Sequence, residues 1–159
     1  MNEEITMWVQ LDGRKLRWRM VIEGDGPWNL RLESPDGVES TAMGNDVFEA
    51  LRAMRVGLDA RGIKLCCNGA RVDVRPSGLS ASHGAWMVYV LHMWRPVTVR
   101  DLVPTFGYAP PGEIGSTEEQ DAYWERHLKN RKNWLNFANP VWWIYFFTAS
   151  WGRPKWRNR

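Results

Sequence analysis

Residues 5 to 20 alternate between apolar and polar side chains in the pattern of an antiparallel hairpin. Asp12-Gly13 is a two-residue turn sequence whose members tolerate the positive φ angles that such turns require. Pairing outward from this turn fills one face with apolar residues, apart from Arg14 beside the turn: Leu11 with Arg14, Val9 with Leu16, Met7 with Trp18 and Ile5 with Met20. Burial of that face predicts this register, because a shift by one residue would expose it.

A third strand and a helix follow the hairpin in the predicted order. Asp25-Gly26-Pro27 breaks the chain, and Trp28, Leu30 and Leu32 then alternate with polar residues as a strand does. From Ser34 onward we expect a turn and a loop, which lead to Asn45 as the N-cap of a helix. An apolar stripe at helical spacing predicts that this helix covers one sheet face: Val47, Phe48, Leu51, Met54 and Leu58.

The second half of the chain predicts another hairpin and a further strand. Asn68-Gly69 is a favoured turn sequence, and Leu65 and Val72 flank it at positions that would pair. The opposite face of this hairpin would set Cys66 against Arg71 and Lys64 against Asp73. Residues 85 to 93 have few polar side chains on either face, which is typical of a strand covered on both sides.

Two capping patterns predict helices towards the C-terminal end. Thr98 with Asp101 would cap a short helix, and Ser116 with Glu119 would cap a longer one that ends at Asn139-Pro140. Together these elements predict an α+β fold. We expect an antiparallel sheet of about six strands in the order βββ-α-βββ, with one covering helix, followed by C-terminal helices.

Several of these segments resemble a family of small uncharacterised bacterial proteins. The residues that carry the resemblance are Ile63 to Gly78 (IKLCCNGARVDVRPSG), Tyr89-Val90-Leu91, Asp101-Leu102-Val103, Glu118-Glu119-Gln120, Tyr123 and Trp124. The resemblance covers roughly residues 45 to 130 and implies a shared fold, with no activity or catalytic residue carried over. This chain departs from the family's pattern in the loop from Leu79 to Gly84. The family's chains end near the Tyr123 helix, so the resemblance implies that the tail of this chain is an addition.

Charge divides the sequence into an acidic body and a basic, aromatic tail. Residues 126 to 159 contain eight Lys or Arg, five of the 11 Trp and no acidic residue. Residues 1 to 125 carry the other 13 basic residues against all 18 acidic ones, a net charge of −5. We therefore expect an α+β domain over residues 1–132 and an aromatic, basic extension over residues 133–159.

The tail contains seven consecutive apolar residues, 141 to 147, and their pattern does not decide between helix and strand. Leaving them in water would forgo on the order of 10 kcal/mol, at about 1.5–3 kcal/mol for each large side chain. We expect them to be covered by the domain's own core, by a protein partner or second copy, or by a membrane surface. A nucleic acid is not expected, because the acidic body would repel its phosphates.

The function predicted from this tail is that of a non-enzymatic binding protein that docks to a protein partner or to a second copy. Aromatic and arginine side chains are the usual anchors of such interfaces. The candidate contact residues are Trp134, Trp142, Trp143, Tyr145, Phe146, Phe147, Trp151, Arg153, Lys155, Trp156 and Arg157. Peripheral binding to a membrane surface through the same tail is the alternative.

A small enzyme built around Cys66, Arg71 and His83 is a second alternative. A reactive thiol needs a neighbouring cation. Arg71 would supply it if the predicted hairpin sets it opposite Cys66. The cysteines are otherwise expected to be buried and structural. Arg75, Ser77 and His83, in the polar loop before residue 85, are candidates for contact with a ligand.

Several kinds of site and a secretory or membrane-spanning segment are not expected, because the sequence lacks their patterns. Three scattered histidines and two adjacent cysteines do not match the ligand spacing of a metal site, and no phosphate-binding glycine loop occurs. We therefore expect no metal and no cofactor. The acidic N-terminus has no secretory signal pattern, and the longest apolar run is far shorter than the about 20 residues of a spanning helix. A cytoplasmic location is expected.

Overall fold

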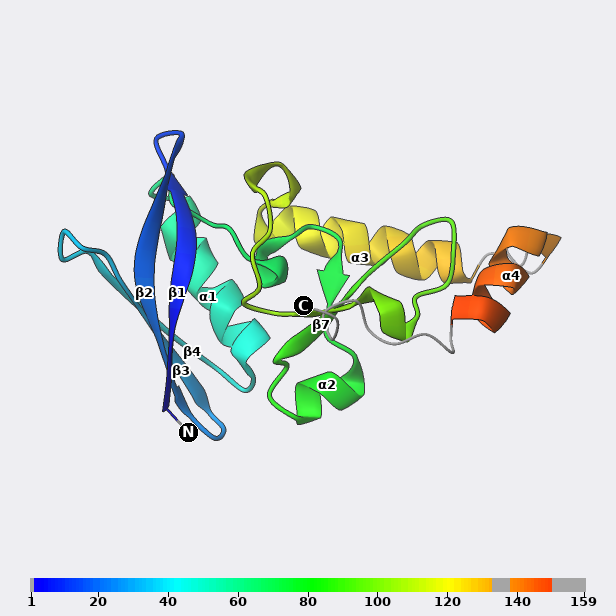
Figure 1. The fold of residues 1–159 in the computed structure, drawn as a ribbon, viewed down its shortest axis with the longest axis horizontal. Helices are drawn as coiled ribbons and strands as arrows, with labels where there is room; N and C mark the ends of the chain where they lie inside the picture. The colour runs from blue at the N-terminus through cyan, green and yellow to red at the C-terminus, as the bar shows by residue number, and fades with distance from the viewer. Residues whose placement is uncertain (1, 133–137, 150–159) are drawn as a thin grey trace.

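The computed structural model describes residues 2–132 and 138–149, which form two antiparallel sheets and several helices (Figure 1). Four strands precede the first helix, and short strands alternate with short helices after it. The elements, with η for 3₁₀ helices, are β1 (Asn2–Leu11), β2 (Arg14–Gly24), β3 (Trp28–Glu33), β4 (Glu39–Gly44), α1 (Val47–Asp59), β5 (Lys64–Leu65), η1 (Asn68–Ala70), β6 (Val74–Arg75), α2 (Gly78–Ser82), β7 (Met87–Val90), η2 (Val99–Asp101), β8 (Leu102–Pro104), η3 (Pro111–Glu113), α3 (Thr117–Arg131) and α4 (Pro140–Ala149).

The first sheet has the order β4-β3-β2-β1-β5, with α1 packed against it (Figure 1). The β1–β2 hairpin has the register predicted from its turn, including Val9 opposite Leu16 and Met7 opposite Trp18. Trp28 to Glu33 form the predicted third strand, which pairs with β2. Val47, Leu51, Met54 and Leu58 of the predicted helical stripe are buried against this sheet, as their apolar spacing indicates. Phe48 is also buried, but it packs in a separate cluster with Val74 and Val88.

The strand β4 occupies residues that we expected to form a loop. Apart from Met43, its side chains are small or polar, and they alternate between exposed and half-buried positions at the sheet edge. Gly44 ends β4 where the chain passes close to α1, and a Cβ on this residue would lie 2.3 Å from the backbone nitrogen of Ala50. The N-cap also differs by one residue, because the side chain of Asp46 accepts a 2.7 Å hydrogen bond from the amide of Glu49. Asn45 instead donates to the Glu49 carboxylate.

The predicted hairpin at Asn68-Gly69 is wrong. Those residues begin the 3₁₀ helix η1, while β5 pairs with β1 and β6 pairs with β7. The backbone amides of the expected turn donate to a distant segment: Asn68 to the carbonyl of Gly107 at 2.7 Å, and Gly69 to that of Thr105 at 2.8 Å. Tertiary hydrogen bonds therefore override the local preference of the Asn-Gly pair.

The second sheet has the order β6-β7-β8 and lies beyond α1 (Figure 1). The strand predicted over residues 85–93 is limited to β7, and its central position agrees with its apolar sequence. The loop before it contains the short helix α2, with Ser77 as N-cap. The α+β class and the antiparallel pairing are thus confirmed, whereas the single six-stranded sheet is replaced by one sheet of five strands and one of three.

Helix α3 begins at the predicted capping box of Ser116 and Glu119 but ends at Arg131, before the expected stop at Asn139-Pro140. Pro140 instead begins α4, a position that proline tolerates because the first helical N–H groups have no partner within the helix. The side chain of Asn139 accepts a 3.0 Å hydrogen bond from the amide of Val141. The same dipeptide therefore starts one helix rather than stopping another.

A buried arginine joins α1 to α3 and to η1. Arg55 is 1% exposed, and it donates to the carbonyls of Gly69 and Gly115 and to the side-chain oxygen of Gln120. The amide of Gln120, also fully buried, donates to the carbonyls of Gly69 and Arg71. Burial lowers the pKa of Arg55, the direction expected when a charged group loses water.

We predict that Arg55→Met lowers the free energy of unfolding by about 2–4 kcal/mol, because buried acceptors lose their donor while the apolar stem is kept. Urea denaturation measures the change. Arg61→Met removes the same group from an exposed position at the end of α1 and should change stability by less than about 0.5 kcal/mol. Equal effects of the two substitutions would contradict the role given to Arg55.

Candidate functional site

A cleft of about 610 Å³ lies between the segment after β7, the C-terminal part of α3 and the inner side of α4. Its wall combines basic and polar side chains with aromatic and aliphatic ones, and none of its described lining residues is acidic. The lining residues are Ser77, Tyr89, His92, Met93, Arg95, Pro96, Val97, Thr98, Val99, His127, Asn130, Arg131, Trp142 and Phe146. Its volume is within the range of about 300–1,000 Å³ that is usual for small-molecule sites.

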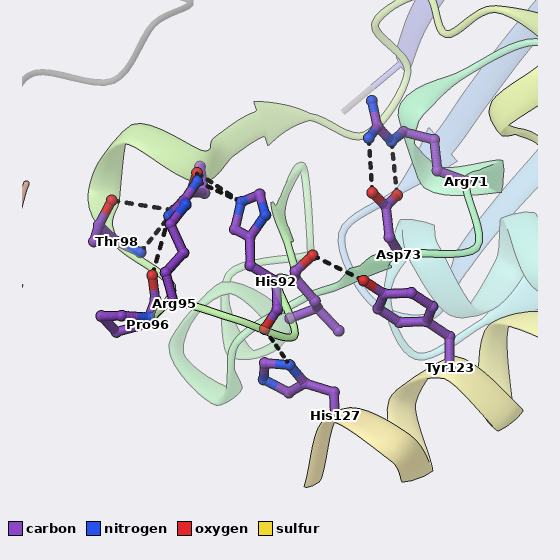
Figure 2. Close-up of polar contacts among 10 residues, drawn as sticks. Arg71, Asp73, His92, Arg95, Pro96, Thr98, Tyr123 and His127 are labelled. Atoms are coloured by element: carbon purple, nitrogen blue, oxygen red, sulfur yellow. Dashed lines mark hydrogen bonds and ion pairs between the residues drawn. The ribbon is translucent and has the colours of Figure 1, made fainter. Parts of the chain in front are cut away.

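The segment that forms one wall of the cleft, which includes Arg95 and Thr98 (Figure 2), is held by the carboxylate of Asp101. Arg95 donates to its two oxygens at 2.7 and 2.5 Å, a fork-like pairing with fixed geometry. The backbone amide and the hydroxyl of Thr98 donate to the same carboxylate at 2.9 and 3.1 Å. This is the predicted Thr98–Asp101 capping box, and the structure adds Arg95 to it.

Asp101 remains ionised although its side chain is only 5% exposed. Burial alone would raise the pKa of this carboxyl, but hydrogen bonds from Arg95, from His92 and from the Thr98 amide outweigh it and hold the pKa well below its usual range. The charge of Arg95 is correspondingly matched by Asp101. The pair is a structural wall that contributes little net charge to the cleft.

His92 lies beside this ion pair, with its Nε2 atom 3.1 Å from Asp101 and 2.5 Å from a nitrogen of Arg95. A ring nitrogen cannot donate to the carboxylate and accept from the guanidinium at once, so the two contacts belong to different proton positions on the ring. One nitrogen of His92 is therefore in contact with both members of the Arg95–Asp101 pair.

His127 projects from α3 towards the same segment, as Figure 2 shows. Its Nδ1 donates to the carbonyl of His92 at 3.1 Å, and its ring stacks on Trp124 at a centroid distance of 5.8 Å. Burial lowers the pKa of His127, which outweighs the opposing effect of that hydrogen bond, so the ring is neutral at pH 7. With Nδ1 carrying the proton, Nε2 is a hydrogen-bond acceptor at the cleft wall.

The opposite wall belongs to α4. The ring of Tyr145 packs edge-on against Trp94 at 5.5 Å and lies 4.9 Å from the guanidinium carbon of Arg95. Trp142 and Phe146 line the cleft and stack on each other at 5.7 Å. These contacts tie the inner side of α4 to the body and give the cleft an aromatic surface.

The outer side of α4 exposes large apolar side chains. Ile144 and Phe147, three positions apart, are 60% and 65% exposed. Val141 and Trp143 are also exposed. The helix is therefore apolar all round, which in a water-exposed element is typical of a surface that another molecule covers.

The residues predicted for the tail divide between described and undescribed parts of the chain. Trp142, Trp143, Tyr145, Phe146 and Phe147 are all in α4, so the described part of residues 141–151 is helical. The other predicted residues lie outside the described residues: Trp134, Trp151, Arg153, Lys155, Trp156 and Arg157. Trp142, Tyr145 and Phe146 contribute to the inner side, and Trp143 and Phe147 to the exposed surface.

The three candidates for ligand contact in the loop before β7 lie in different surroundings. Ser77 lines the cleft, whereas Arg75 pairs with Asp121 and borders a second cleft of about 590 Å³. His83 is exposed at the end of α2, where its Nδ1 lies 2.9 Å from the carbonyl of Leu79. The structure thus brings only Ser77 into the cleft that contains His92 and His127.

The geometry does not assemble the alternative enzyme site at Cys66, Arg71 and His83. Arg71 forms a two-point pair with Asp73 and a 2.5 Å ion pair with Glu113. Both cysteines are buried; burial raises the pKa of the Cys66 thiol, and it raises that of Cys67 to about 12. A raised pKa opposes the thiolate that nucleophilic chemistry needs, so these residues are structural in this arrangement.

Sequence reasoning missed Arg95, His92 and His127 as a group. The usable signal was the Thr98–Asp101 cap, since a carboxylate in a buried cap attracts a nearby cation such as Arg95. The position of α3 against this segment depends on the Arg55–Gln120 contacts, which sequence spacing does not reveal.

Comparisons with known proteins were made by family model and by curated sequence, and neither gives a match to this chain. Among residues 2–132 and 138–149, no cluster of three or more His, Cys, Asp or Glu side chains is arranged to hold a metal ion. The described helices include none with the length and apolar character needed to cross a bilayer. Function is therefore inferred from the chemistry of the site itself.

We predict that His127 makes the protein less stable as the pH falls through about 6.5, the ordinary value for histidine. The folded-state pKa is depressed, so the unfolded chain binds the proton more readily and stability is lost below that pH. Arg131 and His92, the other basic groups acting on this ring, lower its pKa in the same direction. In the His127→Gln variant, the urea midpoint of unfolding should change less between pH 7.5 and 5.5 than it does in the parent protein.

The control for this measurement is His83→Gln, which changes an exposed histidine. It should keep the pH profile of the parent protein. If both variants follow the parent profile, the neutral buried state assigned to His127 is incorrect.

We also predict that neither Cys66 nor Cys67 reacts quickly with a thiol reagent in the folded protein. Burial blocks access and a raised pKa removes the thiolate. Absorbance with dithionitrobenzoate at pH 8 should show two slow thiols that become fast in denaturant. Rapid modification of Cys66 in the native protein would instead favour the enzyme alternative.

Proposed function

We propose that this protein is a binding protein that uses the outer side of α4 as its docking element for another protein chain. The observation that carries the proposal is the exposure of Ile144 and Phe147 on a helix that has no polar side. Burying about half of each of the four exposed side chains on this side, Val141, Trp143, Ile144 and Phe147, would contribute on the order of 4 kcal/mol. That is enough to support an association when the contact is well packed.

The helix has a defined orientation relative to the body, which supports docking over burial in its own domain. Tyr145 contacts Trp94 and Arg95, so the inner side of α4 is already occupied. Rotating the helix to bury Ile144 and Phe147 would remove these contacts. Ile144 and Phe147 are therefore left exposed for contact with another molecule.

The charge around α4 indicates which surface fits it. The last turn of α3 carries Lys129 and Arg131, and Lys132 follows. No acidic residue occurs in the sequence from residue 126 onward. A complementary surface is apolar at its centre and acidic at its rim. Because the body of this chain has a net charge of −5, a second copy meets the charge requirement, and it is the occupant we propose.

Binding to an anionic membrane surface is the competing function, and a specific feature favours it. Aromatic side chains and basic residues occur together at α4, as they do in proteins that bind the headgroup region. Helix α4 has ten residues, about 15 Å in length, so it would enter the interface rather than span the bilayer. The test below separates the two functions.

We predict that the full chain is a concentration-dependent oligomer in light scattering and that Ile144→Glu with Phe147→Glu makes it a monomer. Two carboxylates at the centre of an apolar contact remain unpaired, which should weaken association at least about 100-fold. Met43→Glu, on exposed β4, is the matched control and should leave the mass unchanged. Circular dichroism should show equal helix content in all three proteins.

A full chain that stays monomeric at every concentration contradicts self-docking. In that case flotation with vesicles of mixed phosphatidylcholine and phosphatidylserine decides the competing function. Salt-sensitive flotation that the double variant loses would support membrane binding, and no flotation would reject both functions for α4.

A further inference from the structure

We propose that the cleft on the inner side of α4 binds a small organic monoanion, a carboxylate attached to an aromatic or other apolar body. The site is separate from the docking face, because it is lined by Trp142 and Phe146 rather than by Ile144 and Phe147. The inference therefore goes beyond the proposed function.

The apolar part of the cleft fits the body of such a ligand. Trp142 and Phe146 supply stacked aromatic rings on one side. Met93, Val97 and Val99 supply aliphatic surface on the other side. An apolar ligand body placed between them would displace water from both walls, which is the main source of affinity in pockets of this size.

The polar part of the cleft carries more positive than negative charge. Asp101 is the carboxylate behind the wall, and Arg95 and Thr98 already occupy both of its oxygens. Arg131 lines the cleft from the last turn of α3, and no residue in 2–132 or 138–149 forms an ion pair with it. Its guanidinium is therefore available to a ligand anion.

The number of uncompensated cations limits the charge of the ligand. Arg95 is neutralised by Asp101, and His127 is neutral because burial lowers its pKa. Arg131 is left as the lining group whose charge is not matched within the described residues. One guanidinium matches a carboxylate, whereas a phosphate dianion would retain an unpaired charge in a largely apolar site.

The wall that faces the ligand is fixed before binding. The Arg95–Asp101–Thr98 contacts hold the segment after β7, and His127 fixes the carbonyl of His92 from α3. A fixed wall reduces the ordering that binding would otherwise require. The neutral Nε2 of His127 adds an acceptor for a hydroxyl or N–H group on the ligand.

The test is calorimetric titration of the full chain with 3-phenylpropionate, indole-3-acetate and octanoate. At least one should bind saturably with one site per chain. The neutral amide of the same acid should bind at least about tenfold more weakly, because it lacks the charge that pairs with Arg131. Acetate and inorganic phosphate, which lack the apolar body, should show no saturable binding.

Two variants locate the binding. Arg131→Gln should weaken binding of the carboxylate at least about tenfold and leave binding of the amide unchanged. Arg14→Gln makes the same charge change at the β1–β2 turn, at the opposite end of the molecule from α4 (Figure 1), and should have no effect. Val97→Trp, which fills the cleft, should abolish binding of every probe.

Several results would overturn the proposal: no saturable binding of any of the three acids, equal binding of acid and amide, or full binding to the Val97→Trp protein. The Ile144→Glu, Phe147→Glu variant separates this proposal from the docking function, because neither residue lines the cleft. This variant should lose self-association but still bind the carboxylate.

Discussion

The fold depends on a charged group placed where water cannot reach it. Arg55 lies in the middle of α1, and its guanidinium connects that helix to η1, to Gly115 and to Gln120 of α3. A buried cation costs free energy unless its donors are used, so the three surrounding segments are constrained to present oxygens to it. This requirement selects one arrangement of the second half of the chain, whose strands are too short to do so themselves.

The same constraint positions the cleft. Gln120 fixes the first half of α3, and the neighbouring Asp121 pairs with Arg52 of α1. The second half of the helix then extends along the segment that follows β7, where Tyr123 donates to the carbonyl of Leu91 and His127 to that of His92. Helix α3 therefore connects Arg55 to the cleft wall, because it contacts Arg55 through Gln120 and the wall through His127.

Features set by neighbouring residues could be predicted from the sequence, and those set by residues far apart in the chain could not. The β1–β2 register and the stripe on α1 follow from periodicity, since each is decided by which face is buried. The Asn68-Gly69 hairpin failed because the amides of that turn bond to residues 105 and 107, far along the chain. The cleft was predictable only at Ser77 and at the Thr98–Asp101 cap, because Arg95, His92 and His127 converge through tertiary packing that spacing does not encode.

The Asp101 carboxylate serves two structures at once. One of its oxygens accepts from the amide and the hydroxyl of Thr98, which caps η2, and also from Arg95, which forms the cleft wall. Helix start and wall therefore cannot loosen separately: a fluctuation that releases Arg95 also weakens the cap, and fraying of η2 frees the arginine. Motion in this region is expected to occur as a single cooperative opening, with the Thr98 amide as its natural reporter in hydrogen exchange.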